Sequence, residues 1–173
     1  MNKSSFSAYS DQISFIWCLL HLYYVKGSLD EVMNLVSSIY EQQFEFTSEF
    51  EGRLLKLWET SDAKFLLEIA KQAATQNLFD IDKHIFIVAL LVENGGISIN
   101  DAALLLKYDA GKNYVKFDKR IRKVIDVTWL VIEDAEDGIM SPEGDDMLAD
   151  ALKEVLSLYR ENICYKECWE EDY

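Results

Sequence analysis

The stretch DIDKHIFIVALLVENGGISIND, residues 80–101, decides the fold class. Residues 85–92 are all apolar, so this run could form either a buried strand or a buried helix. Its length and its flanking residues favour a helix, because Asp80 can cap the start and the glycines after Asn94 can end it. A second capping sequence begins at Ser98. We therefore predict two consecutive helices in this stretch.

Helical periodicity extends over the rest of the chain. Apolar residues recur at offsets of three and four, as an amphipathic helix requires. Ser28 and Ser48 each begin a capping-box sequence, and Gly27 and Gly138 follow two of the helical segments. Residues 124–132 are rich in β-branched side chains and leave a strand as the alternative. The predicted helices span residues 10–26, 29–43, 48–60, 62–77, 81–93, 98–106 and 114–136, with a last one from Pro142 to Tyr159.

These segments predict an all-α protein. The expected architecture is a single-domain bundle or a stack of antiparallel helical hairpins with about seven or eight helices, over residues 1–173, with a short acidic tail. The connections are short, and no linker rich in Pro, Gly or Ser marks a domain boundary. No motif recurs at a fixed period, and a degenerate solenoid stays an alternative.

The most apolar run, residues 13–25, is interpreted as a core helix. A secretory signal does not fit, because Lys3 is offset by Asp11, His21 interrupts the run and no small-residue cleavage site follows. The run is also shorter than the ~20 residues that cross a bilayer. Three cysteines in 173 residues do not suit a disulfide scaffold. The expected location is the reducing cytoplasm.

Few side chains suit catalysis or metal binding. Cys18 and His21 lie three residues apart, where an imidazole could activate a thiol, but both fall in an apolar run and fit a core better, as does His84. Cys164 and Cys168 lie four residues apart and lack two further zinc ligands. We expect a protein that is not an enzyme.

The acidic run that ends at Gly138 has the composition of a calcium loop. Ala135 and Gly144 fall at loop positions where carboxylate ligands are required, so the match fails. No glycine-rich phosphate loop is present in the sequence either. We expect no metal, no cofactor and no catalytic residue.

Charge is the most informative property of the sequence. It contains 17 basic and 31 acidic residues, a formal charge of −14, which argues against nucleic-acid or anionic-lipid binding and favours a basic protein partner. Residues 124–152 include nine acids and no Lys or Arg, and seven of these acids lie within 133–146. A solvated helix-loop-helix corner is the simpler alternative. The predicted partner-binding residues are Glu133, Asp134, Glu136, Asp137, Glu143, Asp145, Asp146, Trp169, Glu170, Glu171 and Asp172.

Two further segments have distinctive charge patterns. Residues 41–51 interleave glutamates with Phe44, Phe46 and Phe50, which is typical of a protein interface. Residues 107–123 carry seven Lys and Arg against two Asp, and their surroundings are loosely similar to a helix-turn-helix. The turn is too long, and the rest of the chain would repel DNA. We expect this basic segment to pair internally or to form a solvated helix face.

The leading hypothesis is a cytoplasmic immunity or inhibitor protein that neutralises a basic bacterial toxin, such as a nuclease. Carboxylates would cover the cationic active site and speed association. The main alternative is an acidic helical adaptor or regulatory scaffold that binds a host protein. A nucleic-acid-binding regulator and an enzyme of unrecognised type are two others. No motif identifies an immunity family, so the hypothesis rests on charge.

Overall fold

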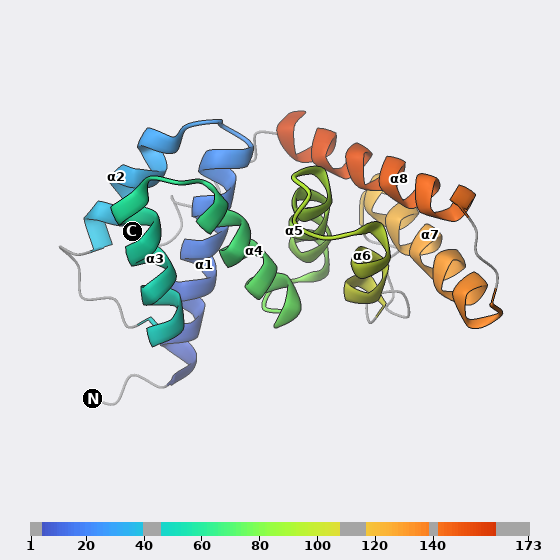
Figure 1. Ribbon diagram of the computed structural model, residues 1–173, viewed down its shortest axis with the longest axis horizontal. Coiled ribbons are helices and arrows are strands. Elements are labelled where there is room, and N and C mark those ends of the chain that lie inside the picture. Colours follow the sequence, from blue (N-terminus) through green and yellow to red (C-terminus); the bar gives the residue numbers. More distant parts are fainter. Residues whose placement is uncertain (1–4, 40–45, 108–116, 139–141, 162–173) are drawn as a thin grey trace. The chain divides into compact units, whose positions relative to one another are not determined.

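The computed structural model describes residues 5–39, 46–107, 117–138 and 142–161 (Figure 1). Within these ranges the protein is all-α, as predicted, and no described residue forms a strand. The β-branched run at 124–132 is helical, because tertiary burial outweighs a weak local preference. The helices are α1 (Ser5–Tyr24), α2 (Leu29–Ile39), α3 (Ser48–Thr60), α4 (Lys64–Thr75), α5 (Ile81–Glu93), α6 (Ile99–Leu106), α7 (Lys119–Glu136) and α8 (Pro142–Glu161).

Two predicted helix ends are confirmed by their hydrogen bonds. At the start of α6, the Asp101 amide donates to Ser98 Oγ over 3.1 Å and the Ser98 amide donates to Asp101 Oδ2 over 3.4 Å. This is the reciprocal pair of a capping box. After α1, Gly27 has a φ of +72°, and its amide donates to the carbonyl of Tyr23 over 2.9 Å. The left-handed conformation that favours glycine therefore closes α1.

One predicted cap and several predicted bounds were wrong, although α3 spans the predicted residues 48–60. α3 is capped by Thr47 rather than Ser48, since Thr47 Oγ1 accepts the hydrogen bond from a first-turn amide. α7 begins at Lys119 rather than at residue 114, because Asp118 lies outside the helix and caps it through the Arg120 amide over 2.8 Å. α1 begins five residues before the predicted position and ends two residues earlier. The predicted extension of α2 to residue 43 lies outside the described residues.

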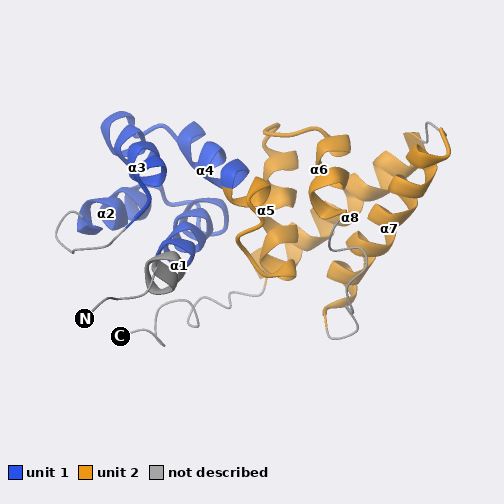
Figure 2. Cartoon of the chain, turned by 90° about the horizontal axis from the view of Figure 1, so that it is seen from below, with its two compact units in different colours: residues 1–72, 164–173 blue, residues 73–163 orange. Residues whose placement is uncertain are grey.

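The chain divides into two compact units (Figure 2). The first comprises residues 1–72 and 164–173, and the second comprises residues 73–163. The single-domain expectation stays a prediction, because a division by packing does not show whether either unit folds alone.

In the first unit, α1 packs on α2 and α2 packs on α3. An aromatic cluster joins α1 to the start of α3: the rings of Phe15 and Phe46 lie 5.4 Å apart, and those of Phe46 and Phe50 lie 5.1 Å apart. Gln12 is buried, and its Oε1 accepts a hydrogen bond of 2.9 Å from the Thr47 amide. The start of α3 is thereby fixed to α1.

In the second unit, α5 packs against α6, α7 and α8. Every residue from 84 to 91 is buried, which explains why this stretch is apolar on all sides and still helical. The rings of Phe86 and Tyr159 lie 4.4 Å apart between α5 and α8. Arg160 donates two hydrogen bonds, of 3.0 and 2.7 Å, to the carboxylate of Glu93. The long helix α8 is therefore held to α5 by a ring contact and a two-point ion pair.

Candidate functional site

α7 and α8 form an antiparallel pair in the second unit, side by side in Figure 1. Their facing sides are apolar and buried, so hydrophobic packing holds the pair together. Among the buried residues are Val124, Val127, Thr128 and Val131 on α7, and Leu148, Ala151, Leu152 and Val155 on α8.

Two ion pairs bridge α7 and α8 at the start of α7. Lys123 Nζ lies 2.7 Å from Glu154 Oε1, and Arg120 Nη1 lies 3.4 Å from Glu161 Oε2. Lys107 on the preceding connection lies 3.5 Å from Glu136. Of these three pairs, Lys107–Glu136 joins the basic segment to the acidic residues 124–152 as predicted, whereas Glu154 and Glu161 lie beyond that acidic segment. Residues 108–116 lie outside the described ranges.

The other half of the pair is acidic, and only some of its carboxylates line a groove. At the end of α7, Asp134 lines it together with Val131 and Ala135, whereas Glu133 does not. Glu133 and Asp134 are three and four residues after Leu130, so both lie near the helix face of Leu130. The structure thus separates predicted site residues that are neighbours in sequence. Asp134, Glu136 and Asp145 line a groove, and Glu133, Asp137, Glu143 and Asp146 are exposed.

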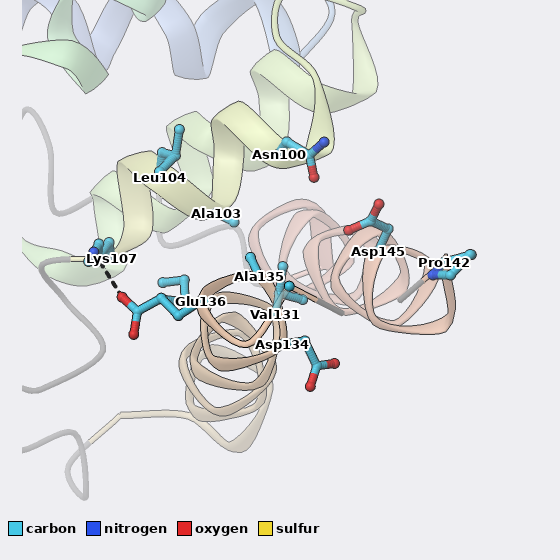
Figure 3. A pocket seen from close by; sticks show the side chains of 12 residues that line it. Asn100, Ala103, Leu104, Lys107, Val131, Asp134, Ala135, Glu136, Pro142 and Asp145 are labelled. Carbon is cyan, nitrogen blue, oxygen red and sulfur yellow. Dashed lines mark hydrogen bonds and ion pairs between the residues drawn. The ribbon is translucent and has the colours of Figure 1, made fainter. Parts of the chain in front are cut away.

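The groove has a volume of about 560 Å³ and lies among α6, the end of α7 and the start of α8 (Figure 3). Val131, Ala103 and Leu104 contribute apolar surface, and the side chain of Leu104 is 63% exposed. Lys107 is the only basic residue among the described residues that line the groove. Figure 3 shows it paired with Glu136. The groove therefore combines apolar walls with carboxylates.

Folding accounts for the acids of α8 but not for those of α7. Glu143 and Asp145 lie in the first turn of α8, where the helix dipole favours negative charge. Glu133 and Asp134 lie at the end of α7, where the dipole disfavours it, and the last turn of α7 has no basic residue. Within the described residues, Glu133, Asp134 and Asp137 form no ion pair. The helix dipole therefore does not explain the position of these three carboxylates.

The structure contradicts the predicted interface role of Phe50 in segment 41–51. Phe50 is 1% exposed and belongs to the core of the first unit, and Phe46 packs on Phe50 and Phe15. Their spacing reflects attachment of α3 to α1, so the prediction was wrong for Phe50. Phe44 lies outside the described residues.

The candidate catalytic side chains of the sequence lie in buried positions. Cys18 and His21 are buried, and burial, with a smaller effect of Lys26, lowers the pKa of His21 below its ordinary value. A neutral imidazole lacks the positive charge that would favour a thiolate. His84 is also buried, and its Nε2–H donates to the Leu105 carbonyl over 3.1 Å.

Metal-ligating side chains do not gather in threes or more among the described residues. Cys164 and Cys168 lie outside the described ranges, as do the predicted partner-binding residues of the tail, Trp169 and residues 170–172. None of the described helices is both long enough and apolar enough to cross a membrane.

Sequence reasoning missed three apolar side chains on the outward face of α7 and α8. Trp129 and Leu130 are each 50% exposed, and Met147 is 48% exposed. Trp129 and Leu130 stand inside a nearly continuous apolar run, so the sequence does not reveal which of its residues face outward.

Comparison with family models, curated proteins and solved structures found no match to this chain.

Proposed function

We propose that the protein is an acidic inhibitor that binds a basic bacterial toxin, such as a nuclease, and covers its cationic active site. The observation that carries this proposal is a cluster of three carboxylates at the end of α7, Glu133, Asp134 and Asp137, which form no ion pair with another described residue. These charges oppose the helix dipole and repel one another. When a basic partner binds, its positive charges would offset both the helix dipole and the mutual repulsion of the carboxylates. The cluster would therefore contribute to recognition of that partner.

The proposed mechanism is electrostatic occlusion. An array of carboxylates resembles the phosphates of a nucleic acid in charge, so it is attracted to the cationic cleft of a nuclease. Long-range attraction speeds the encounter, and the bound inhibitor then excludes the substrate. The inhibitor itself needs no catalytic group for this role.

The test begins with capture of the partner. The tagged protein is incubated with its source lysate at low salt, bound proteins are eluted with a salt step, and they are identified by mass spectrometry. The captured protein is then purified and assayed for degradation of RNA and DNA, with and without the inhibitor. We expect one stoichiometric basic protein whose activity is lost when the inhibitor is added.

A matched pair of variants separates local recognition from net charge. Glu133→Lys/Asp137→Lys should slow association and reduce its salt dependence, because a local attraction becomes a repulsion. Glu51→Lys/Glu59→Lys changes the net charge equally on exposed positions of α3 and should have a much smaller effect. Capture of nucleic acid, or of a basic protein that the chain does not inhibit, would contradict the proposal; the second result would favour an adaptor.

A further inference from the structure

The outward side of the α7/α8 pair carries a patch of large apolar side chains. Leu130 lies seven residues after Lys123, and Met147 lies seven residues before Glu154, whose ion pair of 2.7 Å fixes the alignment of the two helices. Because the helices are antiparallel, the step from Lys123 to Leu130 and the step from Glu154 to Met147 run in the same direction, each by about 10 Å. Seven residues are nearly two full turns, so each step ends on nearly the same side of its helix. Leu130 and Met147 therefore lie at one level of the pair, and Trp129 is exposed at the same level, about 100° further around α7.

Carboxylates flank this patch at both ends. Residues three or four positions from Leu130 and Met147 share the same helix face, one turn away. Lys153 Nζ comes within 4.0 Å of Asp150 Oδ1 and partly compensates that carboxylate. The flanking acids, all exposed, are Asp126 and Glu133 on α7 and Glu143 and Asp150 on α8. We call these four acids together with Trp129, Leu130 and Met147 the outer face.

We infer that the outer face binds an amphipathic helix of the basic protein partner. Apolar side chains of that helix would cover Trp129, Leu130 and Met147, and its Lys or Arg side chains, one turn to either side, would meet the flanking acids. Half-exposed tryptophan and methionine side chains are common at helix-binding surfaces, where they supply most of the contact area. The inference rests on the proposed function for the positive charge of the partner. It adds which surface of this chain binds the partner and that the bound element of the partner is a helix.

Charge complementarity selects this occupant over a second copy of the chain. A symmetric dimer through the outer face would bring the carboxylates of two copies together, and such like-charge contacts are unfavourable. A basic helix instead pairs each flanking acid while it covers the apolar patch. The partner is therefore basic and amphipathic, rather than only basic.

The test uses a defined probe instead of the natural partner. The probe is a fluorescently labelled synthetic helical peptide with leucines on one face and arginines three and four residues from them. A peptide with glutamates in place of the arginines and one with serines in place of the leucines are its controls. Binding to the full chain is measured by fluorescence anisotropy at low and high salt.

The decisive variant is Leu130→Ser/Met147→Ser, and its control is Leu55→Ser, which removes an exposed leucine of α3. We expect the first to weaken binding of the arginine peptide by about tenfold or more and the second to leave it within about twofold. Both control peptides should bind weakly. Circular dichroism checks that each variant keeps its helical content.

Several results would overturn the inference. These are failure of the wild-type chain to bind the arginine peptide, equal binding by the Leu130→Ser/Met147→Ser variant, and loss of binding in the Leu55→Ser control instead. A wild-type dimer that this outer-face variant dissociates in sedimentation experiments would identify a second copy as the occupant and would also overturn it. The peptide assay does not involve a toxin. If the lysate yields no basic toxin that the protein inhibits, the proposed function is rejected. The peptide result then decides on its own whether the inference holds.

Discussion

At the Lys119 end of α7, charges on the two helices are opposite and paired, whereas at the Glu136 end both helices carry acids. Lys123 and Glu154 illustrate the first arrangement, with a contact of 2.7 Å. Glu133 and Glu143 illustrate the second, and neither forms an ion pair within the described residues. Both ends belong to the same antiparallel pair, so packing alone does not require the acidic one. This difference is the basis of our proposal that the Glu136 end binds a basic partner.

The strongest test of this comparison contrasts an inward residue with an outward one on α8. Leu152→Ala should reduce the free energy of unfolding by about 2–5 kcal/mol, because it removes buried side-chain volume. Met147→Ala should change it by less than about 0.5 kcal/mol, because Met147 is half exposed. Urea denaturation followed by circular dichroism measures both. An equal loss in the two variants would mean that Met147 is buried in solution and that the outer face is not open.

The sequence predicted the helices better than it predicted the site, for a physical reason. Ser98 and Gly27 act on their own neighbours, so their capping roles can be predicted from adjacent residues. Asp118 also acts locally, but the predicted helix ran past it because the preceding residues continue the apolar pattern. The end of a helix can therefore be predicted from neighbouring residues only where one capping residue stands out from the apolar pattern.

The arrangement of the site depends on how α7 packs against α8. The number of acids in residues 133–146 is visible in the sequence, but their division between groove and outward face follows from which side of α7 is buried. That side is ambiguous in the sequence because Trp129 and Leu130 stand among Val127, Val131 and Ile132. Phe50 shows the opposite error, since an aromatic residue among glutamates proved to be core.

Neutralisation of acids at the two helix ends should have opposite effects on stability. Glu133→Gln/Asp137→Asn should raise the free energy of unfolding by about 0.3–1 kcal/mol per charge at low salt, because it relieves repulsion and an unfavourable helix dipole. Glu143→Gln/Asp145→Asn removes acids from the favourable end of α8 and should lower it by a similar amount. Urea denaturation at low salt and in 1 M NaCl measures both, and salt should shrink both effects. Changes of the same sign would show that net repulsion, rather than the helix dipole, dominates.

The smallest expected effects come from the ion pairs that hold α8. Double-mutant cycles to alanine should give a coupling energy of about 0.5–1 kcal/mol for Glu93 and Arg160 and about 0.2–0.5 kcal/mol for Lys123 and Glu154. The first is larger because Arg160 makes two hydrogen bonds to one carboxylate, and both remain small because water screens exposed pairs. A coupling energy for Lys123 and Glu154 that exceeded the other would contradict this order.

The same hydrogen bonds give the Glu93 pair a dependence on pH. Hydrogen bonding to Arg160 lowers the pKa of Glu93 below its ordinary value of 4.5. The folded protein therefore keeps this carboxylate ionised to a lower pH than the unfolded chain does. The stabilisation is complete above pH 4.5 and is lost as the pH falls through the lowered pKa. Glu93→Gln should remove this part of the acid sensitivity, which urea denaturation at a series of pH values measures. An unchanged pH profile would show that the pair contributes nothing to stability in solution.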